Sequence, residues 1–351
     1  MNYKTGTLTL LSLFIFLFFH ACSWENKEEI ARAKFVEDSI QAAKLEQIRL
    51  DSIQAVYESF RPENIIIEKE LLYDNHTLGD TYPYKDTTRE FQWEKIRVFL
   101  GMFDSLQNEP VQWGILKNRK NFNGEAPLVK HVVEDAYGNM ADTFGVERYQ
   151  SIPLFSLHDT TIPERYAFDG SLIKIIDDKG DSMDMVSIWS TTNNEEWKVP
   201  RKYIKYISDT VIFEKIIFVD RHNQNLTTLE KKDKKWLIRS MNPATTGVYR
   251  PPYMQETPLG VFVVQEKKVK MFYFKDGTEE IDGFAPHASR FCNGAYLHGI
   301  PVKLPNITPI EYSFRLGTKP LSHMCVRNAT SHSEFVFNWA PVEESLVIIL
   351  E

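Results

Sequence analysis

Ser322-His323-Met324-Cys325-Val326-Arg327 is the most informative stretch of this 351-residue sequence. It places a cysteine two residues after a histidine and two residues before an arginine. A thiol is nucleophilic only as its thiolate, so a reactive cysteine needs nearby positive charge and a base. A second histidine stands upstream, in Tyr296-Leu297-His298-Gly299. Cysteine and histidine also occupy structural positions in most chains, so the surrounding segments must decide between the two interpretations.

Further motifs precede the cysteine in a definite order. They are Thr257-Pro258-Leu259-Gly260-Val261-Phe262, then Leu297-His298-Gly299, then Leu316-Gly317-Thr318-Lys319-Pro320-Leu321. Together with the Ser-His-x-Cys-Val-Arg stretch, this series resembles the YkuD-type L,D-transpeptidase catalytic domain of bacterial cell-wall enzymes. One such motif alone is weak evidence, whereas the ordered set is specific. The resemblance runs from about Phe213 to Glu351.

The resemblance implies a peptidoglycan cross-linking enzyme. Members of the family cut the bond after the third residue of a stem tetrapeptide, release D-alanine and pass the acyl group to a neighbouring side-chain amine. It implies that Cys325 is the nucleophile, leaving an acyl thioester, and that His298 takes its proton. The backbone N–H groups of Met324 and Cys325 are the expected oxyanion donors. No cofactor and no metal are implied.

Other residues of the two motifs are expected to bind substrate or to shape the site. His323 is expected to raise the positive potential beside the thiolate, and Arg327 to hold the loop or a substrate carboxylate, for which its planar donor fork is suited. The thiol pKa is therefore expected to lie below the free value of about 8.5. Ser322, Gly299 and Met324 complete the set of site-shaping residues.

Two departures from the family pattern stand out. Most members carry glycine where this chain has Met324. If that position has positive φ, methionine costs about 1–2 kcal/mol; the alternative is a slightly different turn in which the side chain narrows the groove. In addition, His298 and Cys325 are 27 positions apart (325 − 298), longer than usual. The extra residues, 301–314, are expected to form a lid over the substrate.

Two other functions compete with cross-linking. The same acyl-enzyme chemistry could attach a protein to the wall or release one from it. Alternatively, the chain could be a wall-binding lipoprotein whose catalytic domain has lost activity. The intact Cys325, His298, His323 and Arg327 argue against loss of activity, and Met324 is the one feature in its favour.

The N-terminus indicates export. Lys4 precedes an apolar run over 8–19, which is short for a membrane span, and Cys22 follows directly. This arrangement resembles the lipobox of bacterial lipoproteins, in which the cysteine is lipidated, although Phe19 and His20 depart from it. An uncleaved signal anchor is the alternative. Either way the chain is expected outside the cytoplasm, in the periplasm, attached to the membrane by a lipid anchor.

Composition excludes several other classes. The net charge of −7 and the lack of a basic patch interleaved with aromatics argue against nucleic-acid binding. The scattered His222, His287 and His332 lack metal-ligand spacing. Cys292, the third cysteine, is interpreted as a small buried hydrophobic residue, so no disulfide framework is expected. The sequence leaves the oligomeric state open.

The chain is expected to be mainly β, with an α-helical N-terminal part. After a signal over 1–22, residues 23–60 predict a charged helical stalk with a thin apolar stripe. Residues 61–162 predict an α+β accessory region with one amphipathic helix over about 88–107. Evenly spaced short strands over 163–212 resemble a small SH3-like barrel. Residues 213–351 predict a catalytic β-sandwich, in which 261–264 and 269–274 are expected to pair as a hairpin.

Overall fold

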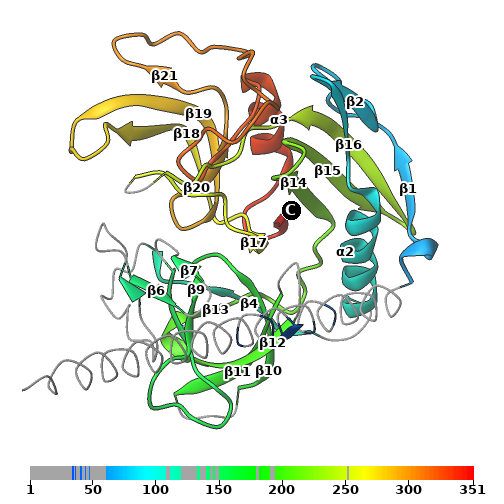
Figure 1. The fold of residues 1–351 in the computed structure, drawn as a ribbon. Coiled ribbons are helices and arrows are strands. Elements are labelled where there is room, and N and C mark those ends of the chain that lie inside the picture. The colour runs from blue at the N-terminus through cyan, green and yellow to red at the C-terminus, as the bar shows by residue number, and fades with distance from the viewer. Residues whose placement is uncertain are drawn as a thin grey trace, which may run out of the picture. The chain divides into compact units, whose positions relative to one another are not determined.

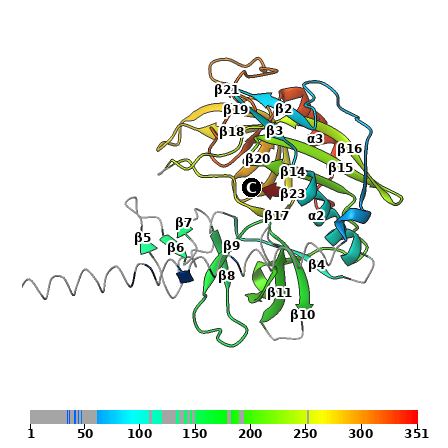
Figure 2. The same ribbon diagram turned by 45° about the vertical axis from the view of Figure 1, so that its right-hand side comes forward.

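The computed structural model describes residues 61–107, 111–119, 151–178, 182–188, 195–250 and 253–351 with their side chains. It also describes the backbone of 133–134, 140–142, 145–146, 150, 189 and 194, and six separate residues between 34 and 47. The chain divides into two compact units, Met1–Val56 and Tyr57–Glu351. The second unit is mainly β, as predicted, and contains the elements drawn in Figures 1 and 2.

A six-stranded mixed sheet organises the catalytic region (Figure 1). Its strand order is β1-β16-β15-β14-β23-β17. The chain's last strand, β23, lies parallel to β14, and β14, β15 and β16 form an antiparallel meander. The strands are β1 (Ile66–Lys69), β14 (Lys215–Asp220), β15 (Asn225–Lys232), β16 (Lys235–Pro243), β17 (Gly260–Val263) and β23 (Ser345–Leu350).

This sheet is buried on both faces, which explains the uninterrupted apolar runs of its central strands. Because successive side chains in a strand point to opposite faces, β14 contributes to two cores. Ile216 and Phe218 belong to one apolar cluster, and Ile217 and Val219 to the other. The central strands therefore hold both layers of the domain together.

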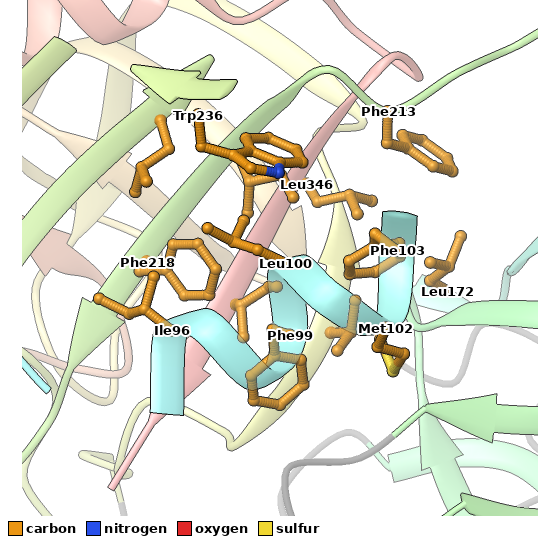
Figure 3. Packing of buried hydrophobic residues seen from close by; sticks show 14 of the residues in the cluster. Ile96, Phe99, Leu100, Met102, Phe103, Leu172, Phe213, Phe218, Trp236 and Leu346 are labelled. Atoms are coloured by element: carbon orange, nitrogen blue, oxygen red, sulfur yellow. The ribbon is translucent and has the colours of Figure 1, made fainter. Parts of the chain in front are cut away.

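Helix α2 (Trp93–Leu106) covers the first face. The predicted helix is confirmed, but it begins later than expected, because Thr87–Glu90 forms strand β3 and pairs with β2 (Thr81–Tyr84). Phe91 precedes the helix but is nevertheless buried, only 3% exposed, in the same cluster. Figure 3 shows the side chains that meet in this core: Ile96, Phe99, Leu100, Met102 and Phe103 of α2 with Leu172, Phe213, Phe218, Trp236 and Leu346.

A second sheet and helix α3 (Thr330–Trp339) share the other core with the first sheet. The strand order of this second sheet is β18-β19-β20-β22, and β21 pairs with β19. Together the layers form a β-sandwich of the expected kind. The strands are β18 (Glu266–Phe274), β19 (Ile281–Cys292), β20 (Ala295–His298), β21 (Val302–Lys303) and β22 (Val326–Arg327).

The prediction that 261–264 and 269–274 pair as a hairpin is wrong. β17 pairs with β23 in the first sheet, whereas β18 pairs with β19 in the second. The chain crosses between the sheets at Val264 and Gln265, whose N–H groups donate to Ser345 O at 3.0 Å and Arg290 O at 2.7 Å. Apolar alternation marks both segments as strands, and it cannot distinguish a turn from a crossing between layers.

The middle region contains a five-stranded antiparallel sheet with the order β12-β11-β10-β4-β13. β4 precedes the predicted 163–212 module in sequence and yet lies between β10 and β13. A closed SH3-like barrel stays a prediction. The strands are β4 (Trp113–Leu116), β10 (Leu172–Asp177), β11 (Met183–Trp189), β12 (Asn194–Pro200) and β13 (Ile204–Tyr206), with the 3-10 helix η3 (Arg201–Tyr203).

The 61–162 region contributes strands to several sheets. β1 joins the catalytic sheet and β4 joins the middle sheet, while β8 pairs with β9, which lies just beyond this region. The described strands β1 and β4 therefore belong to the sheets of the neighbouring regions. The remaining elements are η1 (Pro62–Asn64), β5 (Val133–Glu134), β6 (Met140–Asp142), β7 (Gly145–Val146), β8 (Gln150–Leu154) and β9 (Arg165–Phe168).

The N-terminal predictions fall almost entirely outside the described residues. This applies to the 1–22 signal with Cys22 and to most of the 23–60 stalk, whose six described residues are helical and exposed. None of the helices in the described ranges is long and apolar enough to cross a membrane.

Candidate active site

Strand pairing brings the two principal candidate residues to one edge of the second sheet. β20 and β22 are parallel neighbours, with Leu297 opposite Val326 and His298 opposite Arg327. Cys325 immediately precedes β22, and His298 is the last residue of β20. The N–H of Asn328 also donates to His298 O at 2.9 Å. The sheet register therefore fixes the histidine beside the cysteine loop, although 27 positions separate the two residues (325 − 298).

Cys325 is partly exposed and carries a protonated thiol in this arrangement. Its Sγ donates to Gly294 O, with a 3.7 Å separation between sulfur and oxygen. Burial raises the pKa of the thiol, and a hydrogen bond with the backbone of Tyr296 and the charge of Arg327 oppose this shift only in part. The prediction of a lowered thiol pKa is therefore wrong for this state, because desolvation outweighs the neighbouring cation.

His298 is 3% exposed and electrically neutral near pH 7. Burial lowers its pKa to about 4, with the nearby Arg327 cation acting in the same direction and a hydrogen bond to the Gly299 backbone opposing. Nδ1 lies 2.6 Å from Gly299 O. A carbonyl oxygen can only accept, so Nδ1 carries the proton and Nε2 keeps its lone pair. The ring is thus in the tautomer that a general base requires.

Arg327 is a half-buried cation next to the thiol. Desolvation lowers the pKa of its guanidinium, against the influence of Cys325 and Tyr273. Its Nε is buried and makes no hydrogen bond in the described structure. No carboxylate of the described residues forms an ion pair with it. A buried charge usually has a partner, so this guanidinium is available to an anionic ligand.

Met324 has a φ of 91°, a backbone conformation that favours glycine. The turn therefore does not change to accommodate methionine, contrary to the alternative considered from the sequence. Its side chain is 4% exposed and packs in the core beneath the loop rather than narrowing the approach to the thiol. Gly247 lies against the Met324 backbone, and a Cβ added to Gly247 would be only 2.7 Å from Met324 Cα.

Thr257, the threonine of the Thr-Pro motif, fixes this loop. Its Oγ1 donates to Met324 O at 2.8 Å and accepts from the N–H of Gly247 at 2.8 Å. Thr257 is fully buried. The sequence prediction of site residues did not include Thr257, although its place in the Thr257-Pro258-Leu259-Gly260-Val261-Phe262 motif is a usable signal. Gly294 was also missed, and nothing in its local sequence distinguishes it.

The two residues before Met324 have different surroundings. Ser322 is buried, and its Oγ donates to Cys325 O, so it closes the turn that carries the nucleophile. His323 is exposed, and its Nε2 lies 3.0 Å from Asp276 Oδ2, in the turn between β18 and β19. His323 is thus paired with this turn, whereas the charge of Arg327 acts to lower the pKa of the Cys325 thiol.

Gly299 and the predicted lid are attached to α3. A Cβ on Gly299 would lie 2.8 Å from Thr330 Oγ1 and 2.9 Å from Ser333 Oγ, so only glycine fits. At the end of the lid, Glu311 Oε2 accepts from the N–H of Ser331 at 3.0 Å, near the N-terminus of α3. Phe314 is 83% exposed. Closure of this segment over substrate stays a prediction.

Comparison with known proteins gives a family match over the C-terminal region. Residues 214–349 match the model of the YkuD L,D-transpeptidase catalytic domain. No curated protein matches the chain. The match is to a catalytic domain of the transpeptidase class. More narrowly, residues 214–349 match the YkuD L,D-transpeptidase catalytic domain that the ordered motifs predicted.

Solved structures give weaker similarities. A fused Zn-dependent amidase/peptidase/peptidoglycan-binding domain-containing protein from Clostridium acetobutylicum has 17% identity and a TM-score of 0.29, covering 40% of this chain and 52% of that one. An L,D-transpeptidase from Mycobacterium smegmatis has 17% identity and a TM-score of 0.32, covering 51% and 82%. L,D-transpeptidase 3 from Mycobacterium tuberculosis, in complex with a faropenem-derived adduct, has 18% identity and a TM-score of 0.30, covering 54% of this chain and 72% of that one. The chain spans about half the length of the first of these.

Proposed function

We propose that the C-terminal domain cross-links peptidoglycan by acyl transfer through Cys325. The donor is a stem tetrapeptide, the leaving group is D-alanine, and the acceptor is a side-chain amine of a neighbouring stem. The observation that supports this proposal is the β20–β22 register, in which His298 lies opposite Arg327, two residues after Cys325. The contact of His298 Nδ1 with Gly299 O also leaves Nε2 as the basic nitrogen. Within a YkuD domain, this pair supplies the nucleophile and base that acyl transfer needs.

In the first half-reaction, Cys325 Sγ attacks the carbonyl carbon of the donor's third residue while the thiol proton passes to His298 Nε2. The resulting oxyanion is stabilised by backbone N–H groups of the Met324–Cys325 segment. The C–N bond then breaks, the proton moves from the imidazolium to the departing nitrogen, and D-alanine leaves. The acyl group remains on sulfur as a thioester.

In the second half-reaction, the neutral acceptor amine attacks the thioester carbonyl and loses a proton to His298. The C–S bond breaks, and the imidazolium returns a proton to the sulfur. The product is a new amide between two stems, and the neutral thiol is restored. No external oxidant, reductant or cofactor is needed, because each step only exchanges an acyl group and a proton.

The resting charges favour proton transfer during attack over a preformed ion pair. Burial raises the pKa of Cys325 and lowers that of His298 to about 4, so both groups are neutral near pH 7. Arg327 opposes the thiol shift and therefore stabilises negative charge on sulfur as it develops. We infer that the same unpaired guanidinium also binds a carboxylate of the donor stem.

The test is to identify the acylated residue in the full chain. Incubation with a carbapenem, whose ring opens onto a thiolate, is expected to add one drug mass, mapped by peptide analysis to Cys325. Cys325→Ser is expected to lose the adduct and cross-linking while keeping its fold. His298→Ala is expected to slow acylation by about 10²–10⁴-fold. An adduct on Cys292, or cross-linking by Cys325→Ser, would contradict the assignment.

The strained Met324 favours a second candidate, a wall-binding domain without activity. Purified sacculi and the carbapenem separate the two. Acylation together with new cross-links supports the enzyme. Binding to sacculi with no adduct and no cross-link on disaccharide-tetrapeptide supports the binding domain.

We propose in addition that Cys22 is lipidated and holds the protein at the periplasmic face of a membrane. The support is the apolar run that ends just before this cysteine. Metabolic labelling with a fatty-acid probe is expected to mark the wild-type chain and to miss Cys22→Ser. Equal labelling of both proteins would contradict the anchor and favour a signal peptide or signal anchor.

A further inference from the structure

The turn between β19 and β20, Cys292-Asn293-Gly294, presents a carbonyl to the nucleophile. Cys325 Sγ donates to Gly294 O across 3.7 Å. The turn is constrained at Asn293, which has a φ of 39° and no exposed surface. Whatever holds Asn293 therefore sets the position of the oxygen that faces the thiol.

Asp169, which follows β9 in the middle region, accepts from the N–H of Asn293 directly and reaches the Asn293 carbonyl through Arg290. Asn293 N–H donates to Asp169 O at 3.3 Å. Arg290 Nη1 donates to Asn293 O at 3.4 Å and to Asp169 Oδ2 at 2.7 Å. The Asp169 carboxylate thus orients the arginine that clamps the turn.

The contact around Asp169 is buried and tightly packed. Asp169 is 1% exposed, its Oδ1 accepts from Asn118 N–H at 3.1 Å, and its Oδ2 accepts from Gln265 Nε2 at 3.2 Å. Gly170 has a φ of 95°, and a Cβ there would lie only 2.0 Å from Phe291 O, just before the turn. Little room remains for the turn to move while this contact persists.

A second branch of the network reaches the other neighbour of the thiol. Arg290 Nε donates to Glu266 Oε2 at 3.0 Å, and Arg119 Nη1 donates to the same oxygen at 3.2 Å. Arg119 Nη2 donates to the hydroxyl oxygen of Tyr296 at 3.1 Å. Tyr296 is the residue whose backbone hydrogen-bonds with Cys325. Side chains of the middle region therefore hold the strand on both sides of the Gly294 turn.

We propose that Asp169 is a positioning residue for the nucleophile: through Arg290 and Asn293 it fixes the Gly294 carbonyl against the Cys325 thiol. This inference rests on the proposed role of Cys325. It makes the middle β region part of the active-site framework. The 61–162 region and the middle sheet then brace the catalytic strands through Asn118, Arg119 and Asp169.

The physical consequence of releasing the turn can be stated in advance. A carbonyl oxygen accepts from a neutral thiol and repels a thiolate, so withdrawing Gly294 O favours the thiolate. Misplacing catalytic groups by about 1 Å can cost about 10²-fold in rate. Loss of the Asp169 carboxylate is therefore expected to make the thiol more acidic and yet less productive, a combination that simple destabilisation does not produce.

The test compares two buried carboxylates of the middle region in the full chain. Asp169→Asn removes the charge that orients Arg290. Asp184→Asn is the matched control, because Asp184 is fully buried and paired with Arg201 at 2.7 Å. Arg290→Lys is a second variant, which keeps the positive charge but loses the planar guanidinium that donates to several partners at once. The measurements are the pH midpoint of iodoacetamide alkylation at Cys325, by peptide mapping, and the rate of carbapenem acylation.

We expect Asp169→Asn and Arg290→Lys to shift the alkylation midpoint to lower pH and to slow acylation about 10- to 100-fold. Asp184→Asn is expected to change neither quantity by more than about 3-fold. Equal effects of Asp169→Asn and Asp184→Asn, or no effect of Asp169→Asn, would overturn the positioning role. Absence of acylation at Cys325 in the wild type would instead overturn the proposed function, while the alkylation midpoints would still decide this inference.

Discussion

At the scale of single residues, Met324 combines two opposing contributions to stability. Its φ of 91° costs about 1–2 kcal/mol relative to glycine, whereas its buried side chain contributes about 2–5 kcal/mol over alanine. Met324→Gly is therefore expected to lower the free energy of unfolding by about 0–4 kcal/mol, the packing loss less the relieved strain. Met324→Ala is expected to be less stable still, because it loses the packing and keeps the strain.

Urea unfolding of the wild type and both variants checks this order. At a position inside an ordinary helix or strand, the glycine variant would be less stable than the alanine variant. A glycine variant less stable than the alanine variant would contradict the strain at this position. Val336→Ala, in the same core and on α3, is a control for the effect of a cavity alone.

The residue identities of the candidate site were predictable, but their electrostatics were not. Cys325, His298 and Arg327 follow from the motifs. The sign of the thiol pKa shift depends on whether desolvation or the nearby cation is stronger, and depth of burial is a property of the packed domain. For the same reason the motif could not show that His323 pairs with Asp276 on the surface.

At the scale of elements, the β2–β3 hairpin holds the segment that leads into the nucleophile loop. Arg89, in β3, donates to Gly317 O through Nη1 and to Thr318 O through Nη2, the latter at 2.9 Å. Its guanidinium also lies 3.5 Å from the ring centroid of Tyr84. A few residues later, Leu321 N–H donates to Thr246 O, which begins the turn that carries Cys325.

Arg89→Ala is therefore expected to increase hydrogen exchange across 311–321 and to slow carbapenem acylation by about 3- to 10-fold. The reason is the loss of two hydrogen bonds from a charged donor. Such a bond contributes on the order of 1.5–3 kcal/mol when it is buried, and these two contribute less because they are only partly buried. Exchange by mass spectrometry and acylation kinetics measure the two effects. Arg97→Ala is the control, since Arg97 of α2 also donates to a carbonyl, that of Ile65. Identical changes in both variants would show a general loss of stability.

Element types were largely predictable, whereas their partners were not. The apolar runs of β14 and β23 and the periodicity of α2 follow directly from sequence patterns. Assignment of β17 and β18 to different sheets required the three-dimensional arrangement, because the short connection between them is compatible with a turn. The position of β4 inside the middle sheet is equally invisible to local patterns, since it depends on long-range pairing.

At the scale of the whole molecule, two buried histidines make folding depend on pH. Burial lowers the pKa of His298 to about 4 and that of His332 to about 3, from 6.5. The His332 ring is fully buried, and its Nε2 lies 2.9 Å from Ser240 Oγ. The unfolded chain binds more protons than the native state below pH 6.5, so stability is complete above that pH and falls towards the folded pKa values.

Each ring is expected to lower the free energy of unfolding by about 1.4 kcal/mol for every pH unit that the pH falls in this window. Between pH 6.5 and 4.5 this amounts to about 2–3 kcal/mol for each ring. Denaturant unfolding at a series of pH values measures the slope. His332→Gln keeps a polar side chain that does not titrate and is expected to reduce the slope by about half. His158→Gln, at an exposed position, is the control. An unchanged slope in His332→Gln would contradict the buried, neutral ring.

The sequence by itself determined the catalytic motifs, the mainly β class and the family of the C-terminal domain, because each depends on residue types in a fixed order or on alternation within short segments. The tertiary structure alone decided that burial keeps Cys325 and His298 neutral and that Met324 adopts positive φ. It also decided that Asp169, Arg290 and Asn293 meet beside Gly294. These features arise from contacts between segments far apart in the chain, where burial and neighbouring charge set the energies and local sequence carries no record of the partner.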